Sequence, residues 1–306
     1  MQDIIEKIPR ELLSQELTAD KLLRKTNFGN NEIYVFNYHN SPNMMREVGR
    51  LREIAFREAG GGTGKEIDID FFDTREIPYE QLVVWDPESL EVLGGYRFLH
   101  LGRLLENTKV EFDIATTRLF NVSDEFISTY APYTVELGRS FIQPVYQATK
   151  GKSKSMYILD NLWDGLGALT KTCNDVRYFF GKITMYTHFH TKARDLILFF
   201  FQKYFSDPEN MVYPIQNAGF LTSEDDLKAV FSGDDYKEDY KILSAKVREL
   251  GETIPPLFNA YMKLSPTMKI FGTAINDHFG GVEETGIMIT IEDIYESKKI
   301  RHLEGF

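Results

Sequence analysis

Apolar residues recur at helical spacing in three long stretches of the chain. Residues 44–58 are preceded by Pro42 and followed by the glycines 60–62, which are start and stop signals of a helix. Residues 155–171 place four leucines and a tryptophan on one helical face, and residues 191–204 carry a similar apolar stripe. We therefore predict three amphipathic helices, each with one face packed on a common core.

Short runs of β-branched and aromatic residues between these helices indicate strands. Residues 81–85 and 92–98 are separated by the turn sequence Asp-Pro-Glu-Ser at 86–89, so they predict an antiparallel hairpin. Residues 134–142 predict a longer strand that ends just before a proline. Further strands are expected at residues 33–36, 178–186, 268–273 and 286–291.

This mixture of elements predicts one α/β (α+β) domain over residues 1–306, with a mixed, mostly antiparallel sheet flanked by helices instead of a doubly wound one. Ile and Leu at helical spacing in residues 4–13 predict a first helix, within an N-terminal helical extension of residues 1–30. Its polar face mixes Glu and Lys, which favours packing on the core over packing on a membrane surface. The charged residues 223–250 predict a solvated helical insertion at about 220–255.

Composition narrows the class of function. The chain has 306 residues and a formal net charge of −11, which disfavours a nucleic-acid binder because phosphates require a cationic face. Its single cysteine, Cys173, excludes an internal disulfide framework and fits a reducing compartment. The first residues lack an apolar signal core, and no stretch reaches the roughly 20 apolar residues of a membrane span. We expect a cytoplasmic protein.

Three apparent motifs do not meet the requirements of the chemistry they suggest. Residues 60–65 look like a phosphate loop, but Glu66 replaces the Ser or Thr that would hold magnesium, and the run follows a helix. His188 and His190 lack further ligands for a metal. Cys173 has no evident base near it, so covalent catalysis lacks an obvious nucleophile. We expect no metal and no bound cofactor.

Glu136 and Arg139 are charged residues inside the otherwise apolar strand 134–142. Residues three apart in a regular strand point to opposite faces, but Gly138 permits a bulge that would bring them to the same face. Charges inside a buried strand are costly. The pair is therefore either a structural ion pair at a strand end or a functional pair in which Glu136 accepts a proton from an ammonium nucleophile.

Two stretches without Asp or Glu form a positive island in this acidic chain. Residues 137–159 link a strand to the start of a helix, and residues 181–194 form the second stretch. Backbone N–H groups and lysines there are suited to a phosphate of a pantetheine-bearing partner, such as an acidic carrier protein, although solvated lysines explain the pattern equally well. The candidate residues are Lys150, Lys152, Lys154, Lys182, Lys192 and Arg194.

A series of motifs, taken in order and spacing, resembles one group of enzymes. The motifs are residues 51–57 (LREIAFR), 68–73 (DIDFFD), 95–97 (GYR), 136–140 (ELGRS), 255–257 (PPL), Tyr261 and 277–279 (DHF). They resemble the acyl-carrier-protein-dependent amino-acid N-acyltransferases, a GNAT-like group that is often labelled hemolysin and includes the ornithine- and glycine-lipid synthases. The resemblance covers most of the chain, and its early part extends to the acyl-homoserine-lactone synthases.

The resemblance implies a GNAT-like fold and transfer of a (3-hydroxy) fatty acyl group from an acyl-carrier-protein thioester to the α-amine of glycine or ornithine, in aminolipid biosynthesis. It places Glu136 near the amine as general base, with Arg139 as the second catalytic residue. The thioester would lie where the strand of Glu136 splays from the strand that starts near Tyr178. The sequence lacks the Gly-rich pyrophosphate loop of coenzyme-A-dependent relatives, which favours a carrier-protein donor over acyl-CoA. The implied substrate-binding residues are Arg52, Phe56, Asp70, Asp73, Arg97 and Ser140.

Several alternatives stay open at this stage. Glycine requires only a carboxylate clamp such as Arg97 or Arg52, whereas ornithine also requires an acid, for which Asp70 and Asp73 are candidates. A signal synthase that makes acyl-homoserine lactone would need a site for S-adenosylmethionine. A membrane-active hemolysin is disfavoured by the absence of a spanning segment and of a cationic amphipathic helix. Peripheral contact with the inner membrane face fits an enzyme with an apolar product.

Overall fold

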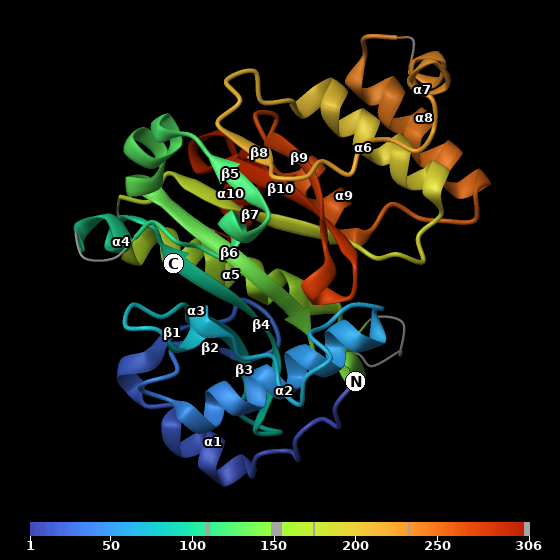
Figure 1. Ribbon diagram of the computed structural model, residues 1–306. Coiled ribbons are helices and arrows are strands. Elements are labelled where there is room, and N and C mark those ends of the chain that lie inside the picture. The colour runs from blue at the N-terminus through green and yellow to red at the C-terminus, as the bar shows by residue number, and fades with distance from the viewer. Residues whose placement is uncertain (108–110, 148–154, 174, 232, 303–306) are drawn as a thin grey trace.

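The computed structural model describes residues 1–107, 111–147, 155–173, 175–231 and 233–302. An eight-stranded sheet forms its centre, in the order β1-β2-β3-β4-β6-β7-β10-β9 (Figure 1). Neighbouring strands run antiparallel except β6 and β7, which are parallel. A small second sheet pairs β5 with β8. The strands are β1 (Leu22–Lys25), β2 (Glu32–Phe36), β3 (Glu80–Asp86), β4 (Glu91–His100), β5 (Phe120–Val122), β6 (Thr134–Ile142), β7 (Tyr178–Met185), β8 (Val212–Pro214), β9 (Lys269–Asn276) and β10 (Val282–Thr290).

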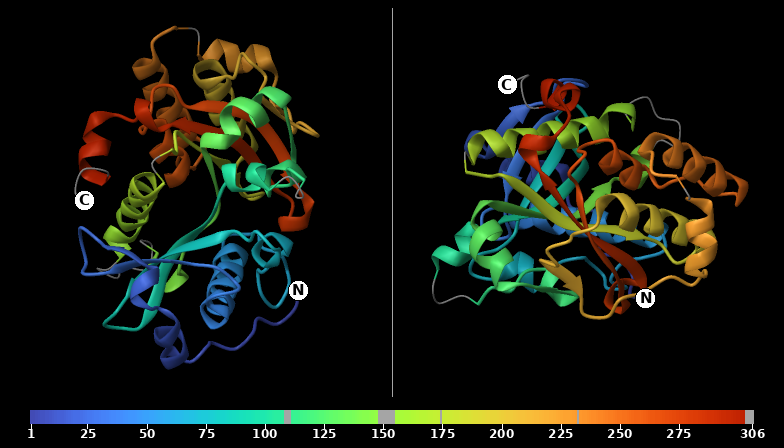
Figure 2. Two further views of the ribbon diagram at one scale, coloured as in Figure 1. Left: turned by 90° about the vertical axis from the view of Figure 1, so that its left-hand side faces the viewer. Right: turned by 90° about the horizontal axis from the view of Figure 1, so that it is seen from above.

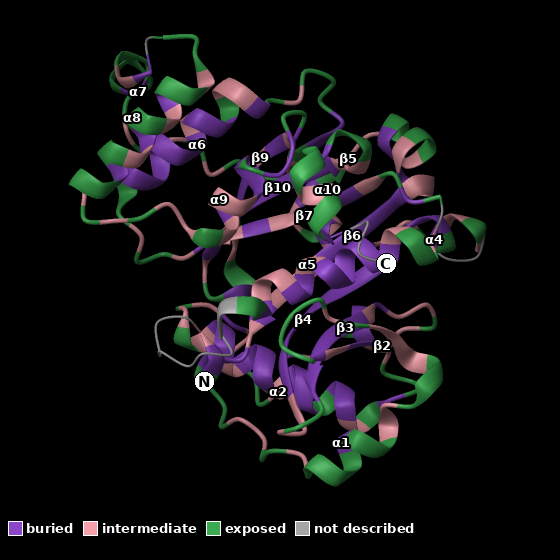
Figure 3. Ribbon diagram, turned by 180° about the vertical axis from the view of Figure 1, so that it is seen from behind, coloured by how far each residue is buried: buried purple, intermediate pink, exposed green. Residues whose placement is uncertain are grey.

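Helices cover both faces of the main sheet. α2 (Pro42–Glu58) packs on one face, where its Phe56 joins a buried cluster with Trp85 of β3. α5 (Ser155–Thr172) and α6 (Thr191–Phe205) pack on the opposite face (Figure 2, left view), and Figure 3 colours many residues of both helices as buried. The other helices are α1 (Arg10–Glu16), α3 (Phe71–Thr74), α4 (Gly102–Glu106), α7 (Glu224–Val230), α8 (Tyr236–Glu249), α9 (Pro256–Met262) and α10 (Glu296–His302).

β6 and β7 pair along only part of their length. Their parallel register runs from Thr134 opposite Tyr178 to Leu137 opposite Gly181, and the pairing ends there although both strands continue. Glycine is required at 181, because a Cβ there would collide with the carbonyl oxygen of Leu137. The sheet therefore opens into a wedge between its two halves (Figure 1). The predicted splaying of the two strands is confirmed.

The predicted architecture of a mixed, mostly antiparallel sheet flanked by helices is confirmed. The helices predicted from apolar periodicity are α2, α5 and α6, and the predicted hairpin is β3–β4. The charged residues 223–250 form α7 and α8. They are not wholly solvated, because Leu243 and Val247 of α8 are buried in the same cluster as α6. One apolar stripe was enough to dock this charged helix on the domain.

The predicted start of the first helix is wrong. α1 begins at Arg10, and residues 2–5 lie beside a loop, where the Ile5 N–H donates to the Glu66 carbonyl oxygen at 3.1 Å. Pro9 directly before α1 disfavours helical geometry in the residue before it, so the helix cannot extend back toward the N-terminus. Farther along this N-terminal segment, β1 is the edge strand of the main sheet.

Candidate active site

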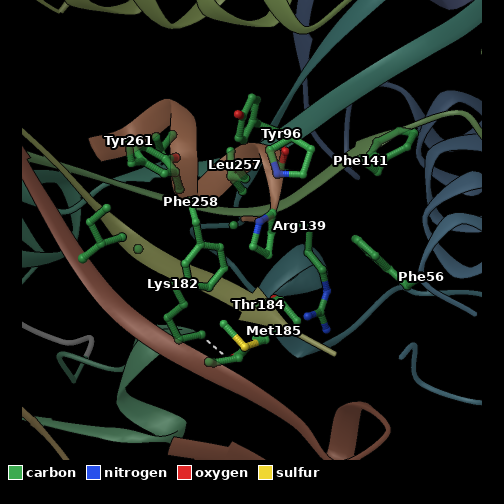
Figure 4. Close-up of a pocket in the computed structure, with 18 of the residues that line it drawn as sticks. Phe56, Tyr96, Arg139, Phe141, Lys182, Thr184, Met185, Leu257, Phe258 and Tyr261 are labelled. Atoms are coloured by element: carbon green, nitrogen blue, oxygen red, sulfur yellow. Dashed lines mark ion pairs between the residues drawn. The ribbon is translucent and has the colours of Figure 1, made fainter. Parts of the chain in front are cut away.

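A cavity of about 550 Å³ lies where β6 and β7 diverge. β6 contributes residues 136–142 to its wall, and β7 contributes Lys182, Thr184 and Met185 from beyond the split (Figure 4). α9 and the segment before it close the cavity on one side. The parting of one pair of strands therefore creates a cavity large enough to hold a ligand.

The cavity has a polar wall and an apolar wall, because successive residues of a strand point to opposite faces of the sheet. Glu136 points toward the face that carries Tyr79, to which it is hydrogen-bonded. The opposite face belongs to the large hydrophobic cluster under α5 and α6. In Figure 4, Leu257, Phe258 and Tyr261 gather on one side of Arg139. The apolar wall includes Leu137, Leu159, Phe179, Leu257, Phe258 and Ile289.

A β-bulge in β6 brings Glu136 and Arg139 to the same side of the sheet. Two residues of β6, Arg139 and Ser140, stand opposite the single residue Tyr96 of β4. Arg139 has φ of 50°, in the left-handed region that non-glycine residues rarely adopt. The bulge predicted beside Gly138 is confirmed. Strained backbone of this kind is concentrated at functional sites.

Glu136 is buried and accepts three hydrogen bonds. The Tyr79 hydroxyl donates to Oε2, and Thr116 donates to Oε1 from its N–H at 2.8 Å and from its hydroxyl at 2.6 Å. The Ala115 N–H in turn donates to the Tyr79 hydroxyl oxygen at 2.9 Å. Burial raises the pKa of Tyr79, and the negative charge of Glu136 raises it further. These contacts hold the carboxylate in one orientation at the cavity wall.

A buried ion-pair network lies behind the polar wall. Arg52 places Nε 3.0 Å from Asp68 Oδ2 and Nη2 3.1 Å from Asp73 Oδ2. Arg97 places Nη1 2.7 Å from Asp70 Oδ2 and 3.2 Å from Asp73 Oδ2. Asp70 and Asp73 also form a capping box at the start of α3. The structure thus brings together the four charged residues predicted to bind substrate, but Arg52 and Asp73 are fully buried and only Arg97 lines the cavity.

Arg139 extends from this network to the cavity. Its Nε lies 3.0 Å from Asp68 Oδ2, and its guanidinium carbon lies 4.2 Å from the centre of the Phe279 ring. Phe279 packs edge-on against Phe56, another predicted substrate-binding residue that lines the cavity. Burial alone would raise the pKa of Asp68, but the charges of Arg139 and Arg52 outweigh it and hold that pKa below its usual range. Arg139 is therefore a fixed cation at the polar wall.

Three hydroxyl groups meet where the bulge reaches the apolar wall. Tyr96, Ser140 and Tyr261 all line the cavity, and Tyr96 contacts both of the others. Burial raises the pKa of Tyr96 and of Tyr261, so both are neutral hydrogen-bond donors at physiological pH. Ser140, predicted as a substrate-binding residue, is thus placed at the cavity.

The sequence reasoning missed Tyr79, Thr116 and Glu284. Glu284 lies on β10, is 4% exposed and lines the cavity, with Oε2 3.5 Å from Lys182 Nζ; Figure 4 draws this ion pair of Lys182 as a dashed line. The sequence did carry a signal for Glu284, because this acid stands beside the apolar run of β10, as Glu136 stands in the apolar strand β6. Tyr79 and Thr116 carried no comparable signal, because only the folded chain places them beside Glu136.

The six residues predicted to meet a carrier protein are not equivalent in the structure. Lys182 lines the cavity and donates to the Ala115 carbonyl oxygen at 3.2 Å, and Lys192 is exposed at the start of α6. Arg194 is 4% exposed and paired with Asp195 and Glu283, so it presents no surface charge. The other three, Lys150, Lys152 and Lys154, lie outside the described residues.

The glycine-rich segment at residues 60–65 binds an anion of the protein itself. Glu53 of α2 accepts hydrogen bonds from the Thr63 N–H at 3.0 Å and the Gly64 N–H at 2.8 Å.

Burial raises the pKa of the Cys173 thiol, which disfavours a thiolate nucleophile. Within the described ranges, no three His, Cys, Asp or Glu side chains are grouped to hold a metal ion. No helix there combines the length and apolar character needed to cross a bilayer.

Comparison with known proteins identifies the group to which the chain belongs. Residues 51–156 match the acetyltransferase (GNAT) domain family. A solved CoA-dependent acyl-homoserine lactone synthase is a distant likeness, with 13% identity, a TM-score of 0.30 and coverage of 54% of this chain and 72% of the other. Two proteins named glycine N(alpha)-acyltransferase, from Bacteroides thetaiotaomicron and Phocaeicola vulgatus, are each 54% identical over 312 residues, covering all of this chain and 91% and 94% of theirs. With this identity along its whole length, the chain belongs to the glycine N(alpha)-acyltransferase family of GNAT acyltransferases.

Proposed function

We propose that this acyltransferase moves a (3-hydroxy) fatty acyl group from a phosphopantetheine thioester to the α-amine of glycine. Its 54% identical relatives are named glycine N(alpha)-acyltransferases, which supports glycine as acceptor. The observation that carries the proposal is the cavity of about 550 Å³ at the split of β6 and β7, with one polar and one apolar wall. Such a cavity suits a reaction between a charged amine donor and an apolar acyl donor.

The acyl donor occupies the apolar wall. Phe179, Leu257 and Phe258 surround the chain, and the thioester carbonyl lies at the split, beside the bulge of β6. Arg139 and Ser140 stand outside the regular register with β4, so their backbone N–H groups are candidates to stabilise the oxyanion. Acyl carrier protein is the proposed donor, because the sequence lacks a Gly-rich pyrophosphate loop and carries a lysine-rich segment after β6.

The acceptor occupies the polar wall. Arg139 holds the glycine carboxylate, because its side chain is the more exposed of the two arginines in the cavity lining: that of Arg97 is 3% exposed and is paired with two aspartates. Arg52 is fully buried between two aspartates and cannot reach a ligand. Glycine is favoured over ornithine, because Asp73, an acid that a second amine would need, is already paired with Arg52 and Arg97. Asp70 is likewise paired with Arg97.

The reaction is a direct displacement at the thioester carbonyl. The lone pair of a free amine forms the C–N bond, and Glu136 accepts a proton from the positively charged nitrogen of the adduct. The C–S bond then breaks, and the pantetheine sulfur leaves as a thiol. Hydrogen bonds from Tyr79 and Thr116 stabilise the Glu136 carboxylate. This carboxylate is suited to accept the proton, because the nitrogen loses it easily once it is bonded to the electron-poor carbon.

The test is an assay of the purified protein with 3-hydroxyacyl carrier protein or acyl-CoA and a panel of amino acids, following thiol release and product mass. Glycine-dependent release that falls about 10²–10⁴-fold in Glu136→Gln supports the proposal. Glu47→Gln removes a buried acid of α2 that does not line the cavity, and it should leave the rate near that of the wild type. Absence of release with every amine would refute the function, and release with ornithine alone would refute the acceptor.

A further inference from the structure

The proposed reaction needs a second base besides Glu136. At neutral pH the α-amine of an amino acid is an ammonium group without a lone pair. Two protons must leave the nitrogen on the way from ammonium to amide, one before the attack and one after it. In the proposed reaction, Glu136 accepts the proton that leaves after the attack. The group that takes the first must face the acceptor with a free carboxylate oxygen or other base.

Glu284 has the geometry that this first step requires. It projects from β10 into the cavity and is 4% exposed. Its Oε2 is buried and has no hydrogen-bond donor among the residues that the structure describes. Both oxygens of Glu136, by contrast, already accept hydrogen bonds. A buried carboxylate oxygen without a donor is costly, and an ammonium ligand would supply the missing donor.

The surroundings of Glu284 place it in the same polar wall as Glu136. Lys182 lies 3.5 Å from Glu284 Oε2 and donates to the Ala115 carbonyl oxygen, while the Ala115 N–H contacts Tyr79, the donor to Glu136. Burial raises the pKa of Tyr186, the residue directly after β7, and the negative charge of Glu284 raises it further.

The two residues paired with Glu284 on the neighbouring strands carry no charge. β9 places Ala274 beside it, and Thr184 is its partner on β7. Across the cavity, β6 presents Glu136 and Arg139. Lys182 thus supplies compensating positive charge to Glu284, but at 3.5 Å it leaves the carboxylate able to accept a proton from a ligand.

We propose that Glu284 binds the α-ammonium of the acceptor and removes its first proton, generating the amine that attacks the thioester. This assignment rests on the proposed amino-acid N-acyltransferase function. The N–H bond breaks, its electron pair stays on nitrogen, and the proton passes to Glu284 and from there to solvent. After attack, the second nitrogen proton goes to Glu136, which passes it to the sulfur as the C–S bond breaks. The net products are amide, thiol and one released proton.

The test compares Glu284→Gln with Glu283→Gln across pH. Glu283 is the neighbouring acid on β10, is paired with Arg194 and does not line the cavity, so its variant controls for loss of an acid from this strand. For E284Q, kcat/KM with glycine should fall about 10²–10⁴-fold at pH 7. The deficit should shrink up to about tenfold per pH unit as pH rises, because solvent then supplies free amine. E283Q should follow the wild-type profile.

A structural role for Glu284 predicts a different result. Its loss would lower the thermal unfolding midpoint and would reduce the rate by the same factor at every pH. Either that result or an E284Q rate within about threefold of the wild type at pH 7 would overturn the assignment. Glu284→Asp should keep the wild-type pH profile at a lower rate. If E284Q does not fold, Glu284→Ala with added formate tests the same point, because formate should restore the rate if a carboxylate acts there. Wild-type protein that is inactive with every amine would instead refute the proposed function itself.

Discussion

Asp68 and Arg139, which are 71 residues apart in the chain, meet at the polar wall of the cavity, where Arg139 Nε lies 3.0 Å from Asp68 Oδ2. Asp68 is fully buried and also pairs with Arg52. A single carboxylate therefore connects the interior of the domain to the one arginine that we propose to bind the acceptor. The same carboxylate holds in place Arg139, which is the residue of β6 with positive φ.

Replacement of Asp68 by Asn should affect both stability and acceptor binding. Removal of one partner of a buried ion pair costs about 3–5 kcal/mol, so the free energy of unfolding should fall by that amount in urea titrations. The KM for glycine should rise more than kcat falls, because Arg139 loses its ion pair at 3.0 Å and keeps only the one with Asp70 at 3.8 Å. An unchanged KM in a folded variant would show that Arg139 does not hold the acceptor.

The same aspartates should govern acid unfolding. Burial would raise the pKa of Asp68 and of Asp70, but nearby arginines outweigh it and hold both pKa values below the usual range. A carboxyl with a lowered native pKa contributes stability above its unfolded pKa of about 3.9, and this contribution is lost as pH falls through the native pKa. The free energy of unfolding should therefore be steady from about pH 7 to 5 and decline below about pH 4. Urea titrations at several pH values check this. In a double Asp68→Asn, Asp70→Asn variant, the free energy of unfolding should decline less as pH falls below about 4.

Tyr79→Phe should lower kcat without removing the general base. The hydroxyl donates to Glu136 and accepts from the Ala115 N–H, so its loss leaves buried groups short of a partner and costs about 1–3 kcal/mol of stability. Tyr204→Phe is the matched control, because that hydroxyl donates to Asp239 and lies outside the cavity lining. Equal kcat losses in the two variants would contradict a role for Tyr79 in orienting Glu136.

Gly181→Ala should disturb the split between β6 and β7. An added Cβ would strike the carbonyl oxygen of Leu137, the last paired residue of β6, and such overpacking costs about 1–3 kcal/mol. Gly138→Ala, where a Cβ would meet nothing within 4 Å, should have little effect on stability. Thermal unfolding of both variants measures the difference. Equal melting temperatures would show that the strands can part at 181 without cost.

Charge reversal of Lys150, Lys152 and Lys154 to Glu should weaken use of a carrier protein as donor. The KM for acyl carrier protein should rise about tenfold at low salt, since electrostatic steering by the segment is lost, and the effect should shrink as salt increases. The same reversal at Lys228, Lys237 and Lys241, on α7 and α8, is the control. If both triple variants leave the KM unchanged, the lysine segment does not meet the carrier.

Local patterns in the sequence were sufficient for most of the elements. Apolar periodicity placed α2, α5 and α6, and turn residues placed the β3–β4 hairpin, because these signals arise within one or two turns of chain. Gly138 within β6 likewise indicated the bulge that brings Glu136 and Arg139 together. The N-terminal helix was misplaced, since contacts of residues 2–5 with a distant loop decided their extended course.

The sequence by itself determined the fold class, the strand that carries Glu136 and the charged residues that gather beside it. Only the tertiary structure decided how those charges are paired: Arg52 and Asp73 are buried partners, Arg194 is neutralised by two acids, and Glu284 enters the cavity from the far end of the chain. The physical reason is that burial and ion pairing depend on which strands are neighbours. The order of the sheet joins segments more than 100 residues apart, such as β6 and β10 on either side of β7, and spacing along the chain does not encode that order.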